Sequence, residues 1–80
     1  MDNMINSLEK LKEEVMEVAK NTKQPADIRA KLISIKQRYL GEEPIWVEAF
    51  LSDTINGRIP ISFFLKKMDE VIIVIQQYKL

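Results

Sequence analysis

The seven residues TINGRIP, from Thr54 to Pro60, decide between two folds for this chain. An Asn-Gly pair between short apolar runs is the strongest local signal for a β-hairpin, which would make the protein α+β. The same residues can instead end one helix at Asn56-Gly57 and place a proline at the start of the next. Pro60 favours the helix end, because a proline three residues after a hairpin turn would remove a donor from the ladder. We therefore predict a helix end and keep the hairpin as the alternative.

Apolar residues recur at helical spacing in two segments before this point. Residues 3–20 and 25–40 each carry them alternately four and three apart, which is the pattern of one buried helix face. Pro25 suits a first helical turn, because its missing N–H would have no helical partner there. Gly41 then supplies the left-handed residue that commonly follows a helix. The two stripes consist of Met4, Leu8, Leu11, Val15 and Val18, and of Ile28, Leu32, Ile35 and Tyr39.

Two further helices are predicted over residues 44–56 and 60–78. Pro44 follows two glutamates, which is a helix start signal, and only a helix gathers the apolar residues of this segment on one side. Residues 71–75 are five β-branched residues in a row, which favour strands locally. Such a run also suits a helix that is buried on most sides, so we predict a central helix. Its stripe consists of Ile61, Phe64, Leu65, Met68, Val71, Ile72, Ile75 and Tyr78.

Short loops join these four segments, and short loops force neighbouring helices to be antiparallel. The chain has 80 residues, of which 46% are hydrophobic and 30% are charged, as is typical of a globular domain. The sequence therefore predicts an all-α fold, an antiparallel four-helix bundle that forms one domain over residues 1–80.

The side-chain inventory argues against an enzyme. The chain has no His and no Cys, so the usual general base, the usual thiol nucleophile and the commonest transition-metal ligands are missing. Its two glycines cannot build a phosphate-binding loop. Glu13, Glu14 and Glu17 could form a carboxylate metal site, but a solvated helix face paired with Lys10 and Lys20 is the favoured interpretation. We expect no catalytic, cofactor-binding or metal-binding residues, and no cofactor.

Nucleic acid is not an expected partner either. Twelve basic and twelve acidic side chains cancel, so long-range attraction to phosphate is small. The second helical segment does carry a row of cations, and two aromatic residues could stack on bases. A solvated helix face remains the favoured interpretation of that row. The residues concerned are Arg29, Lys31, Lys36 and Arg38, with Trp46 and Tyr39 as the aromatic pair.

The location of the protein is predicted from two negative signals. The longest apolar stretch, residues 71–75, is far shorter than the ~20 residues that a membrane span requires. The first ten residues, MDNMINSLEK, lack the basic start and apolar centre of a signal peptide. We expect a cytoplasmic protein without a membrane span.

The best candidate for a partner-binding patch is the corner around residues 57–65. Phe63 and Phe64 are adjacent, so a helix cannot bury both on one narrow stripe, and Ile59 and Ile61 lie beside them. Trp46 either closes the end of the bundle, which is the favoured interpretation, or anchors a partner, since tryptophan is enriched at binding hot spots.

The order of these features resembles the small bacteriocin immunity proteins (enterocin A type), which protect the producers of pediocin-like peptides. The similarity covers nearly the whole chain. It includes the charged first helix with Leu8 and Leu11, the segment IRAKLISIKQRYL, the GEEP break, and RIP before ISFFLKKMDEVIIVIQQY.

This resemblance implies a bacterial, cytosolic four-helix bundle that gives resistance to an antimicrobial peptide. It implies recognition, from the cytoplasmic side, of a membrane permease that the bacteriocin already occupies. The contact residues expected on this basis are Trp46, Arg58, Phe63 and Lys67, and we add Ile59 from the apolar corner.

An alternative interpretation is a phage or mobile-element module for assembly or regulation. Such a protein would form a homodimer through the last helix by burying Val71, Val74 and Ile75 between copies. The immunity-like interpretation predicts a monomer, so the oligomeric state distinguishes the two.

Overall fold

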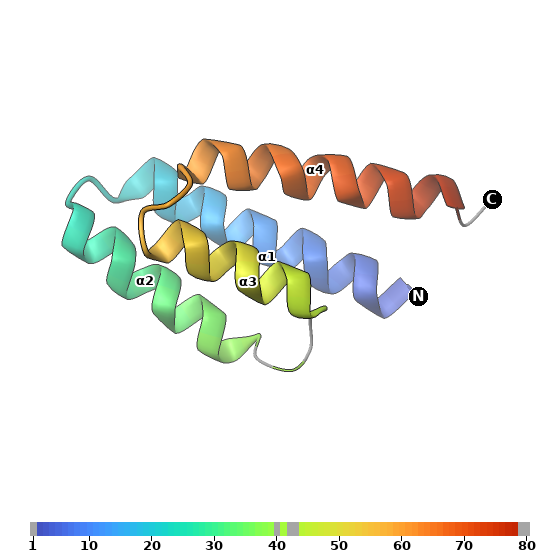
Figure 1. Ribbon diagram of the computed structural model, residues 1–80, viewed down its shortest axis with the longest axis horizontal. Coiled ribbons are helices and arrows are strands. Elements are labelled where there is room, and N and C mark those ends of the chain that lie inside the picture. The colour runs from blue at the N-terminus through green and yellow to red at the C-terminus, as the bar shows by residue number, and fades with distance from the viewer. Residues whose placement is uncertain (1, 40, 42–43, 79–80) are drawn as a thin grey trace.

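The computed structural model describes residues 2–39, 41 and 44–78, and it contains four helices and no strand in this part of the chain. These are α1 (Asp2–Asn21), α2 (Pro25–Arg38), α3 (Ile45–Ile55) and α4 (Ile61–Tyr78). Successive helices run in alternating directions, so the start of α1 and the end of α4 lie at the same end of the bundle (Figure 1). The predicted all-α four-helix bundle is confirmed.

The four helices pack in a closed ring. Among the described residues, α1 contacts α2 and α4, and α3 contacts the same two helices, whereas neither diagonal pair packs together. The molecule measures 42 × 22 × 21 Å, and this cross-section fits two helices by two, because a helix with its side chains is about 10 Å wide. Each helix therefore has two neighbours and keeps an outer side in solvent.

One apolar cluster fills the centre of this ring. The inward stripe of α1 is buried as predicted from Leu8 to Val18, and the side chain of Met4 lies outside the described residues. The other three helices each contribute two or three side chains at helical spacing. The cluster consists of Ile5, Leu8, Leu11, Val15, Val18, Leu32, Ile35, Val47, Leu51, Phe64, Met68 and Ile72.

The prediction that α4 is a central helix is wrong. Its β-branched run is helical, but Ile73 and Val74 are exposed, and only Ile72 within the run is buried. The run is helical because the stripe of Phe64, Met68 and Ile72 packs on the core, and tertiary packing commonly overrides local propensity. Tyr78, which the sequence pattern placed on the buried stripe, is 85% exposed.

The TINGRIP segment ends α3 and contains no hairpin. Gly57 has a φ of +77°, a conformation that glycine adopts without strain. The N–H of Arg58 donates to the carbonyl of Asp53 at 2.8 Å, and the N–H of Gly57 donates to that of Thr54 at 3.1 Å. This pair of bonds is the Schellman motif, so the predicted helix stop is confirmed.

Six helix boundaries differ from the prediction by one or two residues. Helix α2 ends at Arg38, with Tyr39 as its cap, and Leu40 lies outside the described residues. Gly41 does adopt a positive φ, of 84°. Pro44 and Pro60 precede the first helical residues and do not belong to the helices; their carbonyls accept the N–H groups of Val47 and Phe63 at 3.0 and 3.1 Å. A proline is tolerated there because the first N–H groups of a helix have no partner within the helix. The N–H that proline lacks therefore costs no helical hydrogen bond.

Candidate functional site: the α3–α4 face

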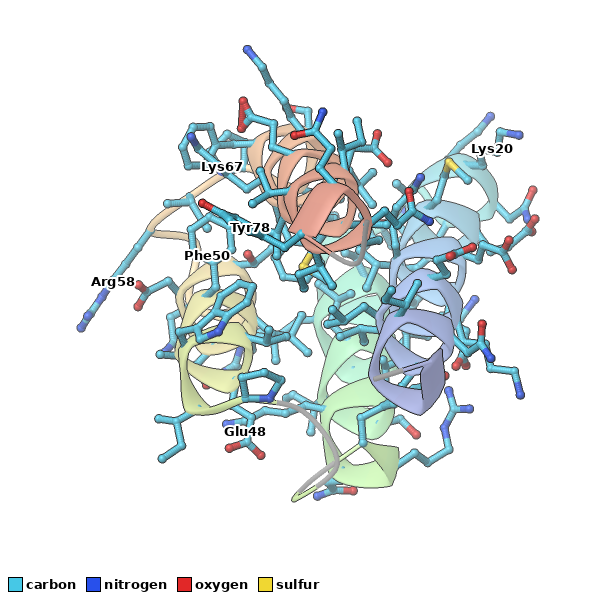
Figure 2. All side chains as sticks on the ribbon, turned by 90° about the vertical axis from the view of Figure 1, so that its right-hand side faces the viewer. Lys20, Glu48, Phe50, Arg58, Lys67 and Tyr78 are labelled. Carbon is cyan, nitrogen blue, oxygen red and sulfur yellow. The ribbon has the colours of Figure 1, made fainter. Side chains whose placement is uncertain are left out.

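Large apolar side chains are exposed along the outer side of the α3–α4 pair. Trp46 is 45% exposed, Phe63 40% and Tyr78 85%. Phe50, Lys67 and Tyr78 lie on one side of the bundle, and Lys20 lies on the opposite side (Figure 2). Residues three or four apart share a side of a helix, which adds Val74 to the set. We call this surface, made of Trp46, Phe50, Phe63, Lys67, Val74 and Tyr78, the α3–α4 face.

A chain of aromatic rings connects this face to the core. Phe64 is fully buried, and its ring centroid lies 5.6 Å from that of Phe50. Phe50 in turn lies 5.8 Å from exposed Phe63, with the two ring planes at 57°. Tilted ring pairs at this distance contribute about 0.5–1.5 kcal/mol each beyond the burial of their area. Phe63 is therefore held in place at the surface, and the prediction that the two adjacent phenylalanines cannot both be buried is confirmed.

The charges near the α3–α4 face are paired with one another. The Lys67 ammonium lies 5.6 Å from the Phe63 ring centroid and 3.2 Å from a carboxylate oxygen of Glu70. At the turn between the helices, Arg58 lies 3.6 Å from Asp53. These pairs are exposed, so they add little stability. They leave the face as an apolar surface with balanced charge at its edge.

The five residues predicted for partner binding lie on this side of the molecule, but not all on the face itself. Phe63 and Lys67 are in contact, and Trp46 is exposed on α3. Arg58 belongs to the turn and projects outward (Figure 2), whereas Ile59 is half-buried.

Sequence reasoning missed Phe50 and Tyr78 as parts of this surface. Phe50 lies four residues after Trp46, a spacing that places both on the same side of a helix, and this signal was present in the sequence. Tyr78 gave no such signal, because its spacing matches the core stripe. It is exposed because α4 extends beyond Ile45, the first residue of α3, in Figure 1, so its last turn has no α3 neighbour.

Two acidic residues of α1 have partners other than the lysines of that helix. Glu14 accepts a hydrogen bond from the Tyr39 hydroxyl and forms an ion pair with Arg38 at 2.5 Å, and Glu17 accepts a hydrogen bond from Asn21 at 2.6 Å. The predicted pairing with Lys10 and Lys20 is therefore wrong: the partners lie on α2 and at the end of α1. Within the described part of the chain, no group of three or more acidic side chains is arranged to hold a metal ion.

The four cations of α2 do not form one basic stripe. Lys31 donates to the Thr22 hydroxyl at 3.0 Å and Arg38 binds Glu14, so both face α1. Arg29 and Lys36 instead line a hollow between α2 and α3. The cations are thus divided between two surfaces, with two side chains on each.

Searches of protein-family models, of curated proteins and of solved structures each gave no match to this chain. Of the described helices, none has the length and apolar content that crossing a membrane would take.

Proposed function

We propose that this chain is a non-enzymatic binding protein that occludes a protein target with its α3–α4 face. The observation that carries the proposal is the set of exposed rings on this face, of which Phe63 is held in place by the Phe50 ring, itself packed on buried Phe64. Tryptophan and tyrosine are the residues most enriched at binding hot spots. A pre-positioned ring also loses less conformational entropy on binding than a free one.

The target that we propose is a membrane permease in complex with a pediocin-like bacteriocin, bound from the cytoplasmic side. This choice rests on the resemblance of the sequence to the bacteriocin immunity proteins.

A protection assay tests this proposal. Sensitive cells that express the chain are challenged with a panel of pediocin-like bacteriocins that includes enterocin A. We expect protection against at least one peptide, and its loss in the double variant Trp46→Ala/Tyr78→Ala. Lys20→Ala, on the opposite side of the bundle, is the control and should protect fully. Immunoblots verify equal expression. Absence of protection across the panel, or full protection by the double variant, would contradict the proposal.

A homodimer formed through α4 is the second candidate, favoured by the exposure of Ile73 and Val74 in adjacent positions. The exposed rings and Val74 of the α3–α4 face offer roughly 400–500 Å² of apolar surface. Two copies meeting there would bury roughly 900 Å² of apolar area, which together with the accompanying polar area reaches the range of stable interfaces. A homodimer through α4 alone would leave the exposed ring of Trp46 on α3 uncovered, which places the homodimer second.

Sedimentation at several protein concentrations separates the two candidates. We expect a monomer throughout. A dimer whose fraction rises with concentration, and which Val74→Asp abolishes, would support the assembly module instead.

A further inference from the structure

A second surface, on the other side of α3, has the properties of a docking groove. Two hollows of about 340 and 400 Å³ lie along α2 and α3, the second reaching the start of α4. Arg29, Ile55 and Asn56 line both of them, so the hollows adjoin and form one groove. We call it the α2–α3 groove.

The walls of this groove are aliphatic. Ile28, Ile33, Ile55 and Ile61 line it, and each of the four is half-buried, with part of its side chain in solvent. They come from three helices. Ile28, Ile55 and Ile61 pack against the edge of the central core. Partly exposed aliphatic side chains in a hollow lose their remaining hydration when an apolar ligand group binds, which favours docking.

The groove also carries two cations without partners among the described residues. Arg29 and Lys36 line it, and neither makes an ion pair or side-chain hydrogen bond with another described residue, in contrast to Lys31 and Arg38. No acidic residue of the described chain lines either hollow. The protein as a whole has zero net charge, so this groove is a local positive site on a neutral molecule.

The spacing of the two cations suggests the shape of the ligand. They are seven residues apart on α2, which is two helical turns or about 10 Å along the axis. Two carboxylates seven residues apart on a helix that lies along the groove have the same separation. Nucleic acid is a poorer fit, because two cations neutralise few phosphates and the isoleucines offer no stacking surface.

We propose that the α2–α3 groove binds an amphipathic helix of a partner protein. Its apolar side chains would cover the isoleucines, and two acidic side chains seven residues apart would pair with Arg29 and Lys36. Arginine suits this role because its planar guanidinium binds a carboxylate through two parallel hydrogen bonds. This site is separate from the α3–α4 face and does not depend on the function proposed for that face.

A peptide titration followed by NMR tests this proposal. The probe is a synthetic helical peptide with leucines on one side and two glutamates seven residues apart beside them. The matched control peptide has lysines in place of both glutamates. We expect the acidic peptide to shift the amide signals of Ile33, Ser52 and Ile55, and the basic peptide to bind about tenfold more weakly or less, since charged hydrogen bonds are lost.

Two double variants complete the design. Arg29→Gln/Lys36→Gln should weaken binding of the acidic peptide by about tenfold or more. Lys20→Gln/Lys66→Gln removes the same amount of charge from exposed positions outside the groove and should not weaken binding of the acidic peptide. The proposal fails if both peptides bind equally, if both double variants weaken binding equally, or if the acidic peptide shifts no groove signal. Binding of decanoate in the groove without binding of the peptide would overturn it in favour of a small anionic amphiphile.

Discussion

Gly57 has a backbone conformation that fits either of two folds. Asn-Gly favours a hairpin only if apolar strands flank it, whereas here the chain before it makes helical hydrogen bonds up to the N–H of Asn56. The positive φ that suits a tight hairpin turn equally suits the residue after a helix. The dipeptide is therefore ambiguous by itself, and the periodicity of the residues around it gives the correct assignment.

Replacing Gly57 by alanine should lower the free energy of unfolding by about 1 kcal/mol, because alanine resists positive φ. A Cβ at this position meets no atom within 4 Å, so backbone strain is the only cost. Gly57→Asn should lower the free energy of unfolding by less than Gly57→Ala does, since asparagine tolerates this conformation better than alanine. Urea denaturation measures the free energy of unfolding of the unchanged protein and of both variants. An unchanged midpoint for Gly57→Ala would contradict this account of the turn.

Glu14 is the residue that ties α1 to the end of α2. It forms an ion pair with Arg38 and accepts a hydrogen bond from the Tyr39 hydroxyl, and its side chain is only partly exposed. Glu14→Gln should cost about 1 kcal/mol of unfolding free energy, a value that allows for solvent screening of the pair. Glu13→Gln, one residue away and exposed, is the matched control and should have no measurable effect. Equal losses in the two variants would show that the Glu14 contacts contribute nothing.

At the scale of elements, α4 is where local sequence and final environment differ most. Residues 71–75 have strand propensity, yet they form a helix because Ile72 and the stripe before it are buried against the core. The same run leaves Ile73 and Val74 in solvent, because among the described helices α4 packs against α1 and α3 alone. Lys12 and Asp69 form an ion pair on the α1 side, and the rings of Phe50 and Phe63 meet on the α3 side.

Two adjacent isoleucines of α4 provide a test of this packing. Ile72 is 7% exposed and Ile73 is 53% exposed. Ile72→Ala should lower the free energy of unfolding by about 2–4 kcal/mol, because it leaves a cavity in the core. Ile73→Ala should change it by less than about 0.5 kcal/mol, since alanine is the better helix former. Thermal unfolding followed by circular dichroism measures both. A similar loss of unfolding free energy in the two variants would mean that α4 is rotated about its axis in solution, so that another side of it faces the core.

At the scale of the whole molecule, the ring of four helices around one cluster implies a single cooperative unit. Every helix contributes to the same core, and no helix could leave without exposing residues of both its neighbours. Unfolding by urea should therefore be two-state. Trp46 fluorescence, which reports on α3, and circular dichroism, which reports on all helices, should give the same midpoint. A lower midpoint from either probe would show that part of the bundle unfolds separately.

Part of the candidate site could be predicted from the sequence. Phe63 was assigned to it from its adjacency to Phe64 and Lys67 from the resemblance to the immunity proteins, and the two are in contact. The ring of Phe50 between Phe63 and Phe64 depends on how close α3 and α4 approach, which no local pattern contains. The α2–α3 groove was missed for the same reason: the row of cations on α2 is visible in the sequence, but its division between two neighbours is not.

The sequence alone determined the number, order and approximate ends of the helices, because these depend on hydrophobic period and on proline and glycine within a few residues. Only the tertiary structure decided which neighbours each helix has, and hence which apolar residues remain in solvent. A residue on a helical stripe is buried only where another helix lies opposite it. Tyr78 continues the stripe of α4 past Ile45, the first residue of α3, so the helical period predicts burial there and the packing leaves it exposed.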